Sequence, residues 1–185
     1  MEVEGVFSET TTWIFEVLHP GPEESPEDGV EALFSVTGEG SSMAVSWGGE
    51  HSGGTLVVDG VYVWRVRGSD DAGNAMSPIS GTVVVDRVPP GLGDIGIERR
   101  ARGRRLLLST SVDGAAIVRA VVLRGRVVIR KLKTREVTEA SDLSWVWDQR
   151  DRKDRRQSHG EYKIRITATD PAKNKTRLLK VFRLV

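Results

Sequence analysis

Residues 60–74 read GVYVWRVRGSDDAGN, and residues 160–174 read GEYKIRITATDPAKN. The two stretches align without insertion or deletion, and Trp47 likewise recurs one hundred residues later as Trp147. The residues that are identical in both stretches, numbered in the first, are Gly60, Tyr62, Arg65, Asp70, Ala72 and Asn74. The chain is therefore a tandem repeat, and we expect each copy to fold around the same strand and turn.

The repeated stretch opens with the residue pattern of a half-buried strand. In residues 162–168 apolar side chains occupy every second position, which places them on one face of a strand. The first copy has the same alternation, with Tyr62 and Trp64 on the apolar face. Arg65 and Arg67 fall on the opposite face, so we expect them to face solvent.

Each strand ends at an aspartate that is followed by turn-forming residues. A carboxylate at this position accepts backbone N–H groups about two residues further on. The residues whose oxygens can also be offered to a calcium ion are Asp70, Asp71, Asn74, Asp170 and Asn174. Because these ligands are few at each site and Pro171 replaces Asp71 in the second copy, the pattern favours turn capping over metal binding.

The aromatic residues of the repeat suit structural roles. A tyrosine two residues into such a strand buries its ring and returns its hydroxyl to the backbone, as in the tyrosine corner of immunoglobulin-like (Ig-like) sandwiches. We therefore expect Tyr62 and Tyr162 to be structural rather than catalytic. Trp47 and Trp147 each close a strand with its own alternation, which predicts buried aromatic anchors.

Length and composition suit two domains, each large enough for its own core. We expect an acidic domain at residues 1–88, a proline-rich linker at 89–91 and a basic domain at 92–185. The first copy has 46 residues before its tryptophan and the second has 56 after Pro90, so the first domain is expected to lack a strand or to begin inside a longer protein.

Three features of the sequence concern disulfides, membrane-spanning helices and export signals. Cysteine is absent, which excludes disulfides and cysteine-rich zinc sites. No run reaches the roughly 18 apolar residues that a membrane-spanning helix needs, so we expect no transmembrane segment. The acidic N-terminus lacks the basic and apolar regions of a signal peptide.

The net charge of +1 conceals an asymmetry between the two copies. Residues 1–90 hold 3 Lys or Arg against 15 Asp or Glu, a net charge of −12; residues 91–185 hold 24 against 11, a net charge of +13. Charge of this kind biases encounters with ions and with other macromolecules. It predicts a protein partner, or self-association in which the acidic domain of one copy meets the basic domain of the same or another copy.

The remaining pattern predicts short strands separated by turns. The expected strands of the first domain, besides residues 60–69, are 3–7, 10–18, 31–37, 42–47 and 82–86. Those of the second, besides residues 160–169, are 95–98, 104–112, 115–123, 127–133, 143–147 and 177–185. The segments expected to be turns or loops are 19–29 (acidic and exposed), 38–40, 113–114, 134–142 and 148–159. This spacing predicts an all-β fold of two tandem Ig-like or fibronectin-III-like β-sandwich domains.

The series of Trp, then Gly-x-Tyr, then Asp-x-Ala-Gly-Asn resembles the Ig-like domain of the bacterial flagellar hook-capping protein (FlgD) and related repeats of bacterial surface proteins. Trp147, Asp148 and Asp151 match the family's Trp-Asp-Gly-x-Asp loop, in which Gln149 replaces the glycine. The resemblance implies a non-catalytic structural or interaction module of a periplasmic, surface or appendage-associated bacterial protein of the cell envelope. Its expected task is protein–protein assembly or adhesion.

The sequence contains no recognisable catalytic motif. Its histidines are His19, His51 and His159, each in a loop without a motif around it. Neither Gly-x-Ser-x-Gly, His-Glu-x-x-His nor a phosphate-binding glycine-rich loop before a helix is present. We therefore expect no catalytic residues, no cofactor and no metal.

Basic residues gather in the second domain. The positions expected to bind an anion or a partner are Arg99, Arg100, Arg102, Arg104, Arg105, Arg124, Arg126, Arg130, Lys131 and Lys133. A third run, at 150–156, alternates with aspartates that weaken its field. A solvated face, an anionic protein or envelope surface, and a polysaccharide or nucleic acid all remain open as interpretations. Against specific nucleic-acid recognition, no aromatic residues lie among the basic ones.

Overall fold

The computed structural model describes residues 1–19, 31–100 and 104–185, and these residues form strands, turns and loops without a helix. The chain divides into two compact units, Met1–Asp86 (unit 1) and Arg87–Val185 (unit 2). The strands of unit 1 are β1 (Glu2–Leu18), β2 (Phe34–Ser46), β3 (Gly60–Asp70) and β4 (Ile79–Val85). Those of unit 2 are β5 (Gly96–Arg100), β6 (Arg105–Arg124), β7 (Val127–Lys131), β8 (Arg135–Trp147), β9 (Gly160–Thr169) and β10 (Lys175–Leu184). The expected all-β class is confirmed.

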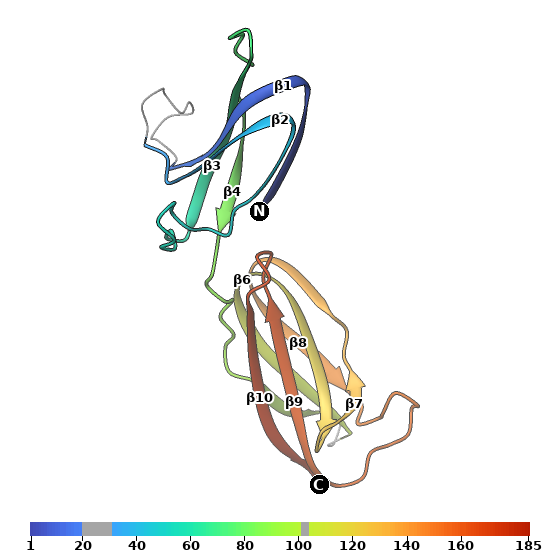
Figure 1. Cartoon of the computed structure of the whole chain (residues 1–185). Coiled ribbons are helices and arrows are strands. Elements are labelled where there is room, and N and C mark those ends of the chain that lie inside the picture. Colours follow the sequence, from blue (N-terminus) through green and yellow to red (C-terminus); the bar gives the residue numbers. More distant parts are fainter. Residues whose placement is uncertain (20–30, 101–103) are drawn as a thin grey trace. The chain divides into compact units, whose positions relative to one another are not determined.

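Unit 1 is one antiparallel sheet in the order β2-β1-β3-β4. The first part of β1 pairs with the end of β2 alone, whereas its second part lies between β2 and β3. The pairing register of β1 with β2 shifts between Val6 and Thr11, where β1 carries extra residues. Figure 1 shows β1 and β2 bending together, so the sheet curls around its own apolar face.

Unit 2 is a sheet in the order β10-β9-β6-β5, and β7 and β8 pair with the remaining edge of β6. One edge of β6 pairs first with β5 and then with β9. The other edge follows β8 in a single register, from Leu106 opposite Trp147 to Val118 opposite Arg135. Apolar residues from both halves of β6 join one core cluster, which requires this sheet to curl as well.

The repeated aromatic residues occupy equivalent, buried positions. The Tyr62 hydroxyl donates to the Val58 carbonyl at 2.7 Å, and the Tyr162 hydroxyl donates to the Ser158 carbonyl at 2.8 Å. The ring centroids of Trp47 and Tyr62 lie 5.8 Å apart, and those of the matching pair in unit 2 lie 5.7 Å apart. All four side chains are at most 1% exposed. Their predicted structural roles are confirmed.

Three predicted breaks are wrong, because long strands run through them. The segments expected to be turns or connections at 38–40, 113–114 and 134–142 lie within β2, β6 and β8 respectively, apart from residue 134. The two short strands expected in residues 3–18 are likewise the single strand β1. In β2 the indole of Trp13 lies over the strand and would meet a Cβ at Gly38, so this glycine makes room for a ring. In unit 2 the ladder between β6 and β8 continues past Gly114, which pairs with Glu139.

The expectation that Arg65 faces solvent is also wrong. Its side chain is 5% exposed, and its Nη2 lies 3.0 Å from Oε2 of Glu16, whose side chain is 8% exposed. Arg67 shares the same carboxylate, with Nη2 3.0 Å from Oε2. Glu16 stands directly opposite Arg65 on the neighbouring strand, so the alternation of β3 has a second buried face that the apolar pattern alone does not reveal.

The expected acidic loop at 19–29 lies outside the described residues, apart from His19. The ring of His19 lies 5.4 Å from that of Tyr62. In the part of the chain that the structure describes, no helix has the length and apolar character that a bilayer crossing demands.

Candidate functional site

The curl of β6 brings its two ends to the same end of unit 2. Leu106, near the start of β6, pairs with Trp147, and Leu123, near its end, pairs with Lys163. The rings of Trp147 and Tyr162 are in contact, so these two ladders lie side by side. The loop 148–159 spans the same end, because it connects Trp147 to Gly160. We call this region the basic end of unit 2.

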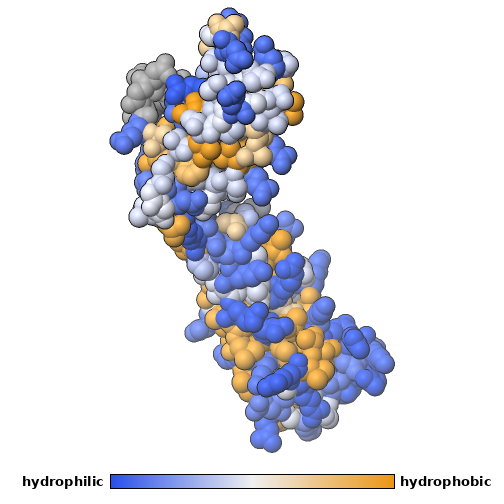
Figure 2. Space-filling view, in the orientation of Figure 1, coloured by the Kyte–Doolittle hydropathy of each residue, from blue (hydrophilic) through white to orange (hydrophobic). Residues whose placement is uncertain are grey.

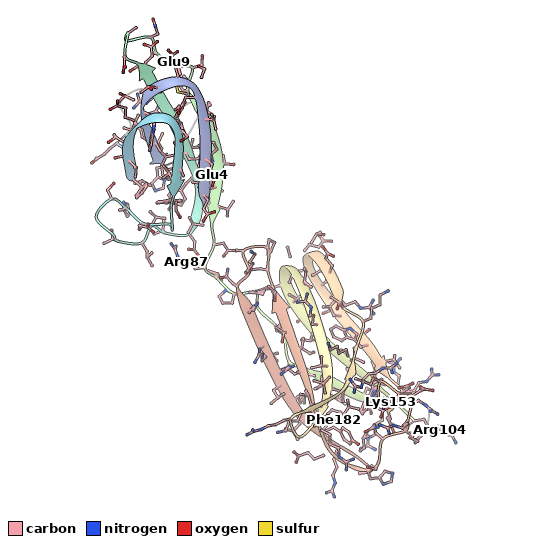
Figure 3. The ribbon with its side chains drawn as sticks, turned by 45° about the vertical axis from the view of Figure 1, so that its right-hand side comes forward. Glu4, Glu9, Arg87, Arg104, Lys153 and Phe182 are labelled. Atoms are coloured by element: carbon pink, nitrogen blue, oxygen red, sulfur yellow. The ribbon has the colours of Figure 1, made fainter. Side chains whose placement is uncertain are left out.

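Three arginine-rich segments meet at the basic end. The first is the β5–β6 hairpin, with Arg99, Arg100, Arg104 and Arg105, all exposed; Arg102 lies outside the described residues. The second is the β6–β7 hairpin, with Arg124, Arg126 and Arg130. The third is the loop 148–159, with Arg150, Arg152, Lys153, Arg155 and Arg156. Figure 3 labels Arg104 and Lys153 at this end, on different segments.

Hydrogen bonds connect the three segments to the body of the unit. The Arg130 guanidinium donates to the Asp151 carbonyl at 2.8 Å, and the Arg152 amide donates to the Ile129 carbonyl at 3.1 Å, so β7 and the loop are joined twice. Arg99 donates to the Arg183 carbonyl on β10 at 3.0 Å. These bonds hold the basic segments in a fixed arrangement.

Arg124 lies where the β6–β7 hairpin meets the loop. Its guanidinium donates to the Ser158 hydroxyl at 2.8 Å and lies 5.4 Å from the centroid of the Tyr162 ring, a cation–π distance. The ring beneath it is the one whose hydroxyl closes the tyrosine corner. The corner therefore fixes the place of a basic side chain as well as packing the core.

Asp151 organises the loop 148–159 from inside. Its Oδ1 accepts from the amides of Lys153 and Arg155 at 2.8 and 3.0 Å, and its Oδ2 accepts from the Arg155 guanidinium at 2.9 Å. The Arg155 amide, followed by the Arg155 side chain and the Lys153 amide, lowers the pKa of Asp151 against the opposing effect of burial. The carboxylate is therefore charged at neutral pH, and its hydrogen bonds hold the loop in shape.

Positive charge exceeds negative charge at the basic end. Ion pairs among the described residues join Arg100 to Glu98, Arg150 to Asp154 and Arg155 to Asp151. Several exposed cations have no such pair with a described residue: Arg104, Arg105, Arg126, Arg152, Lys153 and Arg156. These side chains remain available to an anionic partner.

An apolar area lies beside the basic end. Leu179 and Val181 alternate on the outer face of β10 and are 57% and 52% exposed. Arg183 follows them on the same face, and its own backbone carbonyl accepts the hydrogen bond from Arg99. In Figure 2 apolar residues on the visible face of unit 2 adjoin the hydrophilic lower end. Adjacent exposed apolar side chains bordered by charge can form part of a protein-binding surface.

Not every predicted binding residue belongs to this end. Lys131 pairs with Val121, and the carbonyl of Lys133 accepts from the Trp145 indole at 2.7 Å, so both lie further along the sheet. Sequence reasoning did not include Arg183, because it lies in an ordinary alternating strand. Its place at the basic end depends on the pairing of β10 with β9, which the sequence does not reveal.

The alternative calcium ligands act as turn caps. Oδ1 of Asp70 accepts from the Asn74 amide and Oδ2 from the Asn74 side chain, at 2.8 and 2.7 Å. The Asn74 side chain makes the largest contribution to lowering the pKa of Asp70. In unit 2 the Asn174 amide donates to Oδ1 of Asp170 at 2.8 Å. Among the described residues, no three His, Asp or Glu side chains gather as a metal site would require.

No protein-family model matches the chain, and no curated protein matches it.

Proposed function

We propose that this chain is a non-catalytic interaction module of two Ig-like domains, of the kind that the hook-capping resemblance implies for bacterial envelope proteins. In this proposal unit 2 binds the anionic surface of a protein partner through its basic end. The supporting observation is the convergence of three arginine-rich segments, far apart in sequence, on one end of one unit. Periplasmic or surface location belongs to the same proposal.

The apolar area on β10 favours a protein over other polyanions. Leu179 and Val181 add exposed hydrophobic surface next to the cations, and a protein interface needs such surface at its centre. A polysaccharide or a nucleic acid needs the cations alone. Binding of such a polyanion is the second candidate function, supported by the arginines and the lysine of the basic end that form no ion pair with a described residue.

Two matched triple variants of the full chain test the role of the basic end. Arg104→Ser with Arg126→Ser and Lys153→Ser removes one exposed cation from each segment. Arg119→Ser with Lys173→Ser and Lys175→Ser removes the same charge from exposed positions elsewhere in unit 2. We expect the first triple to weaken binding to poly-L-glutamate or heparin about tenfold in low salt. The control triple should change it by less than threefold; equal losses in both variants would overturn the proposal.

A further pair of measurements separates the two candidates. Leu179→Ser with Val181→Ser leaves all charges in place, so heparin binding should be unchanged. Binding to an acidic protein that pulls down with the full chain should fall, because the apolar part of its interface is lost. Sedimentation of the chain at low and high salt reveals whether that acidic partner is unit 1 of a second copy: a chain that stays monomeric at low salt and high concentration excludes self-association.

A further inference from the structure

Among its described residues, unit 1 shows no counterpart of one strand that unit 2 contains. In unit 2 the start of β6 pairs with β8 on one edge and with β5 on the other. The equivalent part of unit 1 is Glu2–Val6 of β1, which pairs with residues 42–46 of β2. Among the described residues no strand pairs with its second edge.

An apolar groove lies beside this edge. A cavity of about 450 Å³ opens beside the uncovered edge and is lined by apolar side chains that include Val3, Phe7, Met43, Trp64 and Met76. At the equivalent place in unit 2, Ile95 is buried in the core, and Leu92 and Ile97 pack against that core. The segment around β5 therefore fills in unit 2 the space that is open in unit 1.

The uncovered edge also presents backbone groups that no described strand pairs with. The Met1 ammonium donates to the Trp47 carbonyl, and the Trp47 amide donates to the Met1 carbonyl, so this pair exchanges both hydrogen bonds. Because the pattern alternates along an antiparallel ladder, the N–H and C=O groups of Glu2, Glu4 and Val6 point away from β2. In unit 2 the carbonyl of Ser111, which matches Val6, accepts from the Gly93 amide at 3.0 Å.

Charge indicates what kind of segment fits the groove. Its lining includes three acidic residues, Glu4, Glu9 and Asp70, and neither lysine nor arginine. Figure 3 labels Glu4 and Glu9 along β1. Basic side chains on an incoming segment would therefore complement this lining.

We propose that unit 1 binds an extended segment of a partner protein, which pairs antiparallel with Glu2–Val6 as an added strand. The segment inserts alternate apolar side chains into the groove and carries basic residues that face its carboxylates. Strand addition of this kind derives affinity from backbone hydrogen bonds and specificity from pockets for every second side chain. The site lies in unit 1 and does not depend on the basic end of unit 2.

A peptide with the sequence of residues 91–100, GLGDIGIERR, is the probe. Labelled peptide titrated onto the full chain should bind saturably, and asparagine in place of its two isoleucines should weaken binding at least tenfold. Amide hydrogen exchange of the unaltered chain should slow at Glu2, Glu4 and Val6 when peptide is bound. Absence of binding, or binding without protection of these amides, would overturn the proposal.

Two proline variants at facing positions supply the matched control. Glu4 and Ala44 are cross-strand partners in a pair whose N–H groups both point away from the shared ladder. Glu4→Pro removes a donor from the groove edge, whereas Ala44→Pro removes one from the far edge of β2. Glu4→Pro should reduce peptide affinity more than tenfold, and Ala44→Pro less than twofold. Equal effects would contradict strand addition at β1. Dimers of the peptide-free chain that are lost in Glu4→Pro would identify the occupant as a second copy, and so overturn the assignment to a partner protein.

Discussion

The two units share a repeat, but the inward-facing side chains at the start of its long strand are buried more completely in unit 2 than in unit 1. Leu106, Leu108 and Val112 on β6 are at most 2% exposed, whereas Val3 and Phe7, at the equivalent places on β1, are only half-buried. The long strand thus has an apolar inward face in both units. The units differ in whether a segment such as β5 packs beside it. A short segment that contributes five residues of strand decides whether one end of the core is closed.

The buried ion pairs of unit 1 have no equivalent in unit 2. The cross-strand pair Glu16–Arg65 of unit 1 corresponds to Val121–Arg165 of unit 2. Glu16→Gln removes the carboxylate that two guanidiniums share, and it should destabilise unit 1 by about 4 kcal/mol in urea unfolding. Val121→Gln is the control and should cost less than about 1 kcal/mol. Similar costs would mean that the ion pairs do not stabilise unit 1.

Weakening the packing of the segment around β5 against the core should make unit 2 resemble unit 1. Ile95→Ala deletes a side chain that is 4% exposed in the core, and we expect a loss of about 3 kcal/mol in unfolding free energy. Amides of β5 and of the first half of β6 should exchange faster, whereas those of β9 should change least. Uniform acceleration across unit 2 would show that β5 is not a separate cover.

The tryptophan that crosses β2 is specific to unit 1, since Val118 stands at the equivalent position of unit 2. A Cβ at residue 38 would lie 2.7 Å from Cε2 of Trp13, so Gly38→Ala forces the indole to move and should cost about 2 kcal/mol. Gly53→Ala meets no atom within 4 Å and should change stability by less than about 0.5 kcal/mol. Thermal unfolding of both variants checks this difference.

The turn after the repeat strand has the same backbone in both units with different residues. Gly73 has a φ of 86° and Lys173 a φ of 73°, a region that glycine adopts without strain. Lys173→Gly should therefore stabilise unit 2 by about 1 kcal/mol, raising its melting temperature by about 5 °C. Gly73→Lys should lower the stability of unit 1 by a similar amount, and a stabilised Gly73→Lys would refute the equivalence.

The smallest effect concerns pH. Asp151 has a lowered pKa in the folded chain, whereas its counterpart in unit 1 is His51. A lowered folded pKa gives stability that is complete above the unfolded value, near 4, and is lost as the pH falls through the folded value. Asp151→Asn should thus lower the melting temperature of unit 2 at pH 7 but have less effect at pH 3. An effect that is independent of pH would argue against this contribution of the charged carboxylate.

The sequence predicts the repeat, the aromatic core and the turn caps because these depend on residues close together in the chain. Tyr62 and Asp70, for example, find their hydrogen-bond partners within four residues. The long strands are harder to predict from the sequence, because Gly38 by itself indicates a turn. Its place within a strand is explained only by the indole of Trp13, which lies over it from another strand.

The residues of the candidate site could likewise be predicted from the sequence, whereas their arrangement could not. Its arginine-rich segments are evident in the sequence, but their meeting depends on the curl of β6. The burial of Arg65 likewise depends on which strand lies beside β3, since only that strand supplies Glu16. Local pattern therefore identifies the residues, and long-range pairing decides which of them act together.

The bend in β6 also links recognition to folding. An unfolded chain holds the three cationic segments apart and offers an anion only scattered contacts, so a ligand of the assembled cluster binds the native state preferentially. Such a ligand raises the melting temperature of unit 2 as its concentration increases. Partner abundance would then govern how long this half of the protein survives proteolysis.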